Sequence, residues 1–328
     1  HRDLHSFPTR RSSDLIVQGF MWVATLSAII RNRAIPVLVD SDETLNMDPG
    51  DIRNRVTERT KVIIPIPMLG GSANIGKIME VVREINGKRQ KLGLPVIRVL
   101  EDCAQALGGH AKGIPGSVHP LGEEEIYRLG SFGDMAIFSF QINKDITAGE
   151  GGIIVTQDKE LARRAEALHN VGYARPNSNA CNWYGDDPLG WGQGRRMTEL
   201  QAAIARVQLR KLDSILTQMR ASHARIEKYV TSLGLKIRPH VDLQKPGDTG
   251  YYCIFYFPCE GLSEKEKITK GRRIAAALAE YNLHPWFMHD FEIHVYYNLT
   301  PLVAKTPMNN GCPWECPKNE FQIGRAHV

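Results

Sequence analysis

The stretch that decides the fold occupies residues 138–152 and reads Phe-Ser-Phe-Gln-Ile-Asn-Lys-Asp-Ile-Thr-Ala-Gly-Glu-Gly-Gly. The apolar residues 135–140 predict a buried strand and residues 153–156 a second strand, with a glycine-rich loop between them. Lys144 stands in this loop, five residues after Ser139. Burial beside a sheet lowers the pKa of a lysine, and an unprotonated amine is what Schiff-base chemistry needs. Taken alone, the stretch leaves an ordinary solvated lysine as the alternative.

Short apolar runs alternate with segments of helical periodicity along most of the chain. Strands are expected at residues 36–40, 61–66, 95–100 and 251–257, and helices at 24–30, 51–56, 75–84, 161–169 and 265–281. Repeated strand–helix–strand units predict an α/β fold, a mostly parallel sheet with helices on its faces. Ligands of such sheets bind outside the carboxyl ends of the strands. Asp102, Ser139 and Lys144 are therefore expected to lie in one neighbourhood.

The chain divides into two expected regions and two foreign ends. Residues 16–232 are predicted to form a large domain, and residues 233–321 a smaller, incomplete α+β C-terminal domain. A capping box at Thr198-Glu-Leu-Gln predicts a long helix that connects them. Residues 1–15 and 322–328 resemble translated sequencing-library adapter DNA, so we exclude both from the fold and expect the natural protein to be cut at both ends.

Composition excludes several classes of protein. The 328 residues are 42% hydrophobic and 23% charged, as in ordinary globular proteins, and the net charge of +5 is scattered. Without a basic run among aromatics or an apolar run of about 20 residues, we expect no nucleic-acid and no membrane partner. Six cysteines at this length suggest reduced thiols and a cytoplasmic protein. Cys312 and Cys316 lack a second Cys/His pair, so no metal is expected.

Seven short motifs carry a resemblance to a known family. In chain order they are Trp22-Val-Ala-Thr25, Asn46-Met-Asp-Pro49 with Thr60-Lys61, Glu101-Asp-Cys-Ala-Gln105, Gly130-Ser-Phe-Gly-Asp134, Phe138 to Lys144, Gly149-Glu-Gly-Gly152 and Arg196-Met-Thr-Glu-Leu-Gln201. With them the chain resembles sugar aminotransferases of the DegT/DnrJ/StrS type, which use pyridoxal 5'-phosphate and have the aspartate-aminotransferase fold (fold type I). The resemblance covers nearly all of residues 16–320.

The resemblance gives Lys144 and Asp102 the central roles. It implies that Lys144 holds the cofactor as a Schiff base and, once released, moves the proton in transamination. It also implies that the Asp102 carboxylate keeps the cofactor's ring nitrogen protonated, which an electron sink requires. A helix-capping aspartate is the alternative for Asp102.

Three further positions correspond to cofactor contacts in the family. Trp22 falls where the family places an aromatic over the cofactor ring; core packing is the alternative. Gln105 corresponds to a contact with the ring hydroxyl or the substrate; a polar surface residue is the alternative. Ser139 corresponds to the serine that contacts the cofactor phosphate.

Two positions concern the partner subunit and the substrate. Arg196 matches an arginine that reaches across a homodimer interface to the phosphate, and its planar fork also suits a donor carboxylate. Many relatives have Asn where this chain has Gly194, so Gln193 or Arg195 is expected to take over that contact. His294 is a candidate for lining the substrate entrance, with a structural histidine as the alternative.

These correspondences imply an aminotransferase that moves an amino group from glutamate or glutamine to a keto-sugar, often nucleotide-linked, or a keto-cyclitol. A long loop at residues 173–194 fits a bulky hydroxylated acceptor. Family members also carry an N-terminal Ser-Gly-Thr stretch that cradles the phosphate. Sugar dehydratases of the same fold carry His at the position of Lys144, and a regulatory member would have lost Lys144 or Asp102. A nicotinamide dehydrogenase would need Gly-x-Gly-x-x-Gly between strand and helix, and Gly149-Glu-Gly-Gly does not match.

Overall fold

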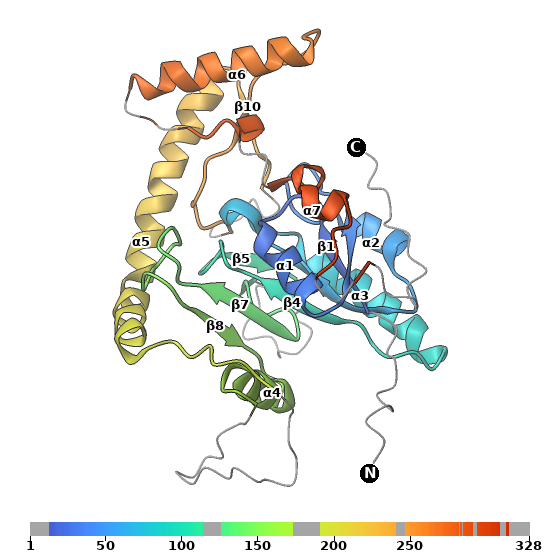
Figure 1. The fold of residues 1–328 in the computed structure, drawn as a ribbon. Helices are drawn as coiled ribbons and strands as arrows, with labels where there is room; N and C mark the ends of the chain where they lie inside the picture. Colours follow the sequence, from blue (N-terminus) through green and yellow to red (C-terminus); the bar gives the residue numbers. More distant parts are fainter. Residues whose placement is uncertain are drawn as a thin grey trace, which may run out of the picture.

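A six-stranded sheet is the centre of the molecule (Figure 1). The computed structural model describes residues 13–113, 126–172, 191–240, 247–281, 283, 285–290, 294–308 and 313–314. In sheet order the strands are β2 (Ile35–Val39), β1 (Asp14–Gln18), β3 (Thr60–Ile64), β4 (Arg98–Asp102), β7 (Met135–Ser139) and β8 (Gly152–Val155). Every neighbouring pair is parallel except β7 and β8, which are antiparallel. The predicted α/β fold with a mostly parallel sheet is confirmed.

Strands β2 and β1 are buried almost throughout and mostly apolar, as expected for parallel strands covered on both faces, whereas β8 at the other edge of the sheet is mostly exposed. The covering helices are α1 (Val23–Arg31), α2 (Pro49–Arg55) and α3 (Ile75–Lys91). In β1, Ile16 belongs to the core cluster that contains Ile78 of α3. The next residue, Val17, belongs to a second cluster that contains Leu26 of α1. Successive side chains of a strand point to opposite faces, so the sheet separates these two cores.

The second half of the chain extends away from this sheet along one long helix. Its elements are α4 (Lys159–His169), α5 (Glu199–Ser232), β9 (Lys236–Ile237), β10 (Phe255–Tyr256), α6 (Glu264–Ala279) and α7 (Thr300–Val303). At 1.5 Å per residue, the 34 residues of α5 are about 51 Å long. The helix begins at the predicted capping box of Thr198 and Gln201. It runs from the side of α4 to α6 and β10 (Figure 1).

Three features differ from the sequence-based expectation. The strand expected at 251–257 is reduced to the two residues of β10, which pair with the two residues of β9. A small antiparallel pair, β5 (His110–Lys112) and β6 (Ile126–Arg128), was not predicted. Strand β1 includes Asp14 and Leu15, which lie inside the segment 1–15 that we excluded. The short 3-10 helices are η1 (Met68–Gly70), η2 (Met288–Asp290) and η4 (Tyr296–Asn298).

Some predictions concern residues that the structure does not describe. These are Cys312 and Cys316, most of the loop 173–194 and the segment 322–328. Within the described residues, none of the helices is both long and apolar enough to cross a membrane.

Candidate active site

The carboxyl end of β4 presents a buried carboxylate, that of Asp102. Its side chain is only 7% exposed. The Thr25 hydroxyl in the first turn of α1 donates to Asp102 Oδ2 at 2.7 Å, and the Ala104 backbone N–H donates to Oδ1 at 3.3 Å. Burial raises the pKa of Asp102, while these hydrogen bonds and the charge of Lys144 lower it. A cation brought next to Asp102 would therefore be strongly favoured.

Lys144 lies in the loop after β7 and is half-buried. Burial lowers the pKa of its ammonium, and the charges of Asp102 and Asp145 raise it. The loop is a compact turn, because the Gln141 carbonyl accepts from the Lys144 N–H at 3.0 Å. The Gln141 N–H in turn donates to Ser139 Oγ at 3.3 Å. The structure thus supports an amine of lowered proton affinity beside the end of the sheet.

The glycines after Lys144 have backbone conformations that explain their positions. Gly149 and Gly151 have φ of 81° and 141°. A Cβ on Gly151 would lie 2.4 Å from Met197 Sδ, and one on Gly152 would lie 2.8 Å from the Phe138 carbonyl oxygen. The loop can return beside β7 only because these residues lack side chains.

Asp145 belongs to the site, although the sequence did not single it out. Its Oδ2 accepts from the Leu107 N–H at 3.1 Å. Its Oδ1 is buried without a hydrogen-bond partner in the described part of the chain. Burial raises the pKa of Asp145 to about 7, against the lowering by the charges of Lys144 and Arg220. An aspartate that follows a loop lysine looks like a solvated residue, so no sequence signal pointed to it.

Trp22 and His294 are brought together by the fold. Trp22 directly precedes α1 and is 43% exposed. The His294 ring lies 5.4 Å from the Trp22 ring, tilted by 49°, and the His294 carbonyl accepts from the Met21 N–H at 2.8 Å. His294 is only 5% exposed, which favours the structural role, whereas the exposure of Trp22 leaves its ring accessible. The role of Trp22 in binding a cofactor stays a prediction.

Gln105 is buried, which argues against the simple surface role. Its Oε1 accepts from the Leu69 N–H at 2.7 Å. Leu69 has φ of 55°, a conformation that non-glycine residues rarely adopt. The side-chain amide oxygen of Gln105 thus stabilises the left-handed conformation of Leu69 in the loop after β3.

Arg196 lies apart from these residues, just before α5. It is exposed, and its Nη1 donates to Asn170 Oδ1 at 2.9 Å. Asn170 forms a backbone bridge with Gly194. Whether Arg196 reaches a partner subunit stays a prediction.

The residues at this end of the sheet fit pyridoxal phosphate. Asp102 offers a buried carboxylate to a protonated ring nitrogen, and Lys144 offers an amine of lowered pKa. Trp22 adds an accessible aromatic face at the start of the helix that holds Asp102 through Thr25. A carboxylate, an amine and an aromatic ring are the groups that this cofactor requires from a protein.

Comparison with known proteins gives consistent matches. The model of the DegT/DnrJ/EryC1/StrS aminotransferase family matches residues 2–306. GDP-perosamine synthase of Caulobacter vibrioides is 33% identical over 255 residues, which cover 76% of this chain and 59% of that protein. L-glutamine:2-deoxy-scyllo-inosose aminotransferase of Streptomyces fradiae is 31% identical over 261 residues, which cover 78% and 55%. The X-ray structure of an aminotransferase from Psychrobacter cryohalolentis superimposes with a TM-score of 0.65 and 23% identity, covering 82% of this chain and 65% of that one.

The chain therefore spans less than two thirds of the length of these proteins. The likeness to the solved structure confirms the fold expected from the seven motifs. Because the family model matches residues 2–306, which include all seven motifs and most of the chain, this chain belongs to the DegT/DnrJ/EryC1/StrS aminotransferase family.

Proposed function

We propose that this protein is an aminotransferase that uses pyridoxal 5'-phosphate to move an amino group from glutamate or glutamine to a keto-sugar or keto-cyclitol. The observation that carries the proposal is the placement of the Lys144 loop after β7, the strand next to β4, whose carboxyl end carries the buried Asp102 carboxylate that accepts from the Thr25 hydroxyl at 2.7 Å. When bound, the cofactor supplies an electron sink for the substrate carbon.

Lys144 and Asp102 divide the proton chemistry between them. Because burial lowers the Lys144 pKa, a larger share of its amine is unprotonated and able to accept a proton. With the cofactor bound, the Asp102 carboxylate would hold a proton at the ring nitrogen through a charge-assisted hydrogen bond. Thr25 keeps the Asp102 carboxylate oriented for that bond.

The remaining site residues are assigned to binding and orienting the cofactor and the substrate. With the cofactor bound, the exposed ring of Trp22 would contact its ring, and the hydroxyl of Ser139 would donate to its phosphate. Gln105 shapes the nearby turn through its hydrogen bond with Leu69. We assign Arg196 to binding a phosphate or the carboxylate of the amino donor. We assign no catalytic role to His294, because it is almost completely buried.

The donor and acceptor are inferred from the relatives. One relative is named as a glutamine-dependent aminotransferase of a scyllo-inosose, a cyclitol ketone, and another as GDP-perosamine synthase. We therefore assign a hydroxylated cyclic ketone as acceptor. Since Lys144 is present where the related dehydratases carry His, the dehydratase alternative is disfavoured.

We further propose a homodimer whose active site lies at the subunit interface. Three exposed apolar residues, Leu200, Ile204 and Val207, follow Arg196 along one face of α5. We also propose the domain division near residue 232 and a cytoplasmic location. The free thiols of Cys103, Cys253 and Cys259 fit a reducing compartment.

The proposal is tested by visible spectroscopy. Purified protein mixed with pyridoxal phosphate is expected to gain the absorption band of the bound cofactor, and glutamate or glutamine should bleach it. Lys144→Ala should lose the band and reduce transamination by roughly 100- to 10,000-fold. Lys211→Ala, at an exposed lysine of α5, is the matched control and should behave like the parent. A band that persists in Lys144→Ala would contradict the assignment.

A further inference from the structure

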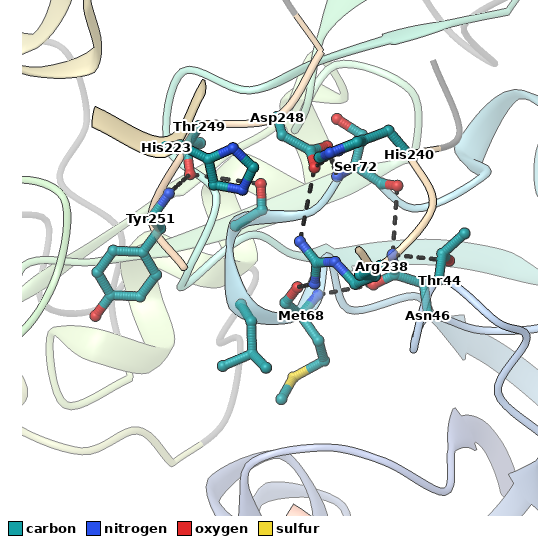
Figure 2. Close-up of polar contacts among 12 residues, drawn as sticks. Thr44, Asn46, Met68, Ser72, His223, Arg238, His240, Asp248, Thr249 and Tyr251 are labelled. Carbon is teal, nitrogen blue, oxygen red and sulfur yellow. Dashed lines mark hydrogen bonds and ion pairs between the residues drawn. The ribbon is translucent and has the colours of Figure 1, made fainter. Parts of the chain in front are cut away.

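A second group of functional side chains lies away from Lys144, where α5 meets the segment after β9. His223 and Glu227 stand four residues apart on α5, so they share one face of the helix. His240 follows β9, and its ring packs edge-on against that of His223, with centroids 5.6 Å apart. One ligand atom from each of the three residues lies within 4.8 Å of the other two. Figure 2 shows the two histidines beside Asp248 and Arg238.

We propose that His223, Glu227 and His240 bind one divalent transition-metal ion, with Zn²⁺ as the preferred ion. Two imidazole nitrogens and a carboxylate oxygen form a ligand set typical of zinc sites with one position left for water. Ligands about 2 Å from a tetrahedral ion are about 3.3 Å from each other. His223 Nδ1 and Glu227 Oε2 are already 3.7 Å apart. Small side-chain rotations would close the remaining separation.

The surroundings orient His240 as a ligand. Its Nδ1 donates to Asp248 Oδ2, which leaves Nε2 to face an ion. Histidine ligands of metal ions almost always donate their other ring N–H to such a partner, and this fixes the ring and its tautomer. The hydrogen bond to Asp248 thus prepares one of the three ligands.

Asp248 is itself fixed by the large region of the fold. Its Oδ1 accepts from the Ser72 N–H at 2.6 Å, and its Oδ2 lies 3.6 Å from Arg238 Nη2 (Figure 2). Arg238 is 3% exposed and also donates to the Met68 carbonyl at 3.0 Å. An ion at the proposed site would therefore be linked to the loop after β3 through buried partners.

Solvent can reach the proposed ligands. The side chains of His223, His240 and Glu227 are 10%, 21% and 40% exposed. His223 also lines a shallow hollow with Ser222, Met219, Tyr251 and Cys253. The site thus has an entry path, which a metal site needs. An ion there would join α5 to the segment after β9 and stabilise the folded protein in proportion to its saturation.

The test uses the full chain, without an affinity tag and without pyridoxal phosphate, after chelator treatment and dialysis. Titration calorimetry with Zn²⁺ is expected to give one site per chain, and Co²⁺ should develop the visible absorption of a four-coordinate ion. His223→Ala and Glu227→Gln should each weaken Zn²⁺ binding at least tenfold. Asp248→Asn should weaken it by about 10- to 100-fold. His289→Ala, at an exposed histidine of η2, is the matched control and should leave binding unchanged.

Several results would overturn the proposal. One is the absence of a stoichiometric site in the parent chain. Another is binding that survives in both His223→Ala and Glu227→Gln, since the second change lies at a partly exposed position and should preserve the fold. A thiolate-to-cobalt charge-transfer band would instead place the ion on cysteines. Circular dichroism of each metal-free variant separates loss of the site from loss of folding.

Discussion

Thr25 provides the side-chain hydrogen bond that favours the charged form of Asp102, against the burial that raises the pKa of this carboxyl. Its hydroxyl is the side-chain partner of the buried carboxylate, and their hydrogen bond lowers the Asp102 pKa. Thr25→Val removes this donor at nearly constant size. We expect the free energy of unfolding to fall by about 1–3 kcal/mol and the affinity for pyridoxal phosphate to fall with it. Urea unfolding and cofactor titration measure the two effects.

The control for Thr25→Val is Thr269→Val. Thr269 is an exposed residue of α6 whose hydroxyl donates to the Lys265 carbonyl. Exposed side chains exchange such a bond for one with water, so this change should cost less than about 0.5 kcal/mol. Equal costs at the two positions would mean that Thr25 does not stabilise Asp102.

Asp145 gives the site a stability that depends on pH. Burial raises the pKa of this carboxyl from 3.8 to about 7, so the folded protein binds the proton more tightly than the unfolded chain. The contribution of the protonated Asp145 carboxyl to the free energy of unfolding is fully present below pH 4. It is lost as the pH rises through 7. The loss is at most about 4 kcal/mol. Asp145→Asn should remove this decline, as measured by urea unfolding between about pH 3 and 8, roughly one unit beyond each end of the transition.

The exposed Asp213 of α5 provides the comparison for this pH series. Asp213→Asn should leave the pH profile of stability parallel to that of the parent. The buried carboxyls Glu101 and Asp102 also have raised pKa values, but they are shared by all three proteins. Their effect cancels in the difference, so parallel profiles for the parent and Asp145→Asn would contradict the assignment.

The sequence alone identified the site residues that belong to recognisable family motifs. It did not identify residues whose role depends on being buried against distant parts of the chain. Lys144 and Asp102 come from motifs, and the structure supports their electrostatic coupling. Asp145 and Thr25 acquire their roles only from neighbours far along the chain, Leu107 and Asp102. Local sequence does not encode such contacts.

At the scale of elements, two glycines of α3 have opposite surroundings. A Cβ on Gly76 would lie 2.3 Å from the Lys112 carbonyl oxygen and 2.9 Å from Gly113 Cα, whereas one on Gly87 would meet nothing within 4 Å. Gly76→Ala should therefore destabilise the fold by about 1–3 kcal/mol, because backbone of β5 must move. Gly87→Ala should stabilise it by about 0.5–1 kcal/mol through helix propensity. Thermal unfolding of the two variants measures the difference, and shifts of the same sign would refute this packing of α3 on β5.

The same scale shows why most helices were predictable and β10 was not. Apolar periodicity and caps such as Thr198 with Gln201 are local, and α5 starts where they predict. The apolar residues 251–257 gave a strand signal, but only Phe255 and Tyr256 find a partner strand. The Tyr251 hydroxyl instead donates to the Asn143 carbonyl beside Lys144. Contacts with residues far along the chain, which the local sequence does not show, therefore determine the conformation of residues 251–257.

At the scale of the whole molecule, α5 has two apolar faces, and the described residues cover only one of them. On its inner face, Ala205, Leu212 and Leu216 pack against Phe140 and Ile146 of the Lys144 loop. On another face, the side chains of Leu200, Ile204 and Val207 are 79%, 48% and 47% exposed. Their spacing of four and three residues places them on one stripe. A second copy of the chain would cover this stripe.

The resulting prediction is a dimer that separates when the stripe is charged. Light scattering after gel filtration is expected to give twice the chain mass for the parent, and the single-chain mass for the double variant Leu200→Lys with Ile204→Lys. Both positions are exposed, so the separated chains should keep the circular dichroism spectrum of the parent. Tyr229→Lys, at a 64% exposed residue near the other end of α5, is the matched control and should remain dimeric. Burying two lysines against a second apolar surface would cost several kcal/mol, so a double variant that stays dimeric would show that the stripe is not the interface.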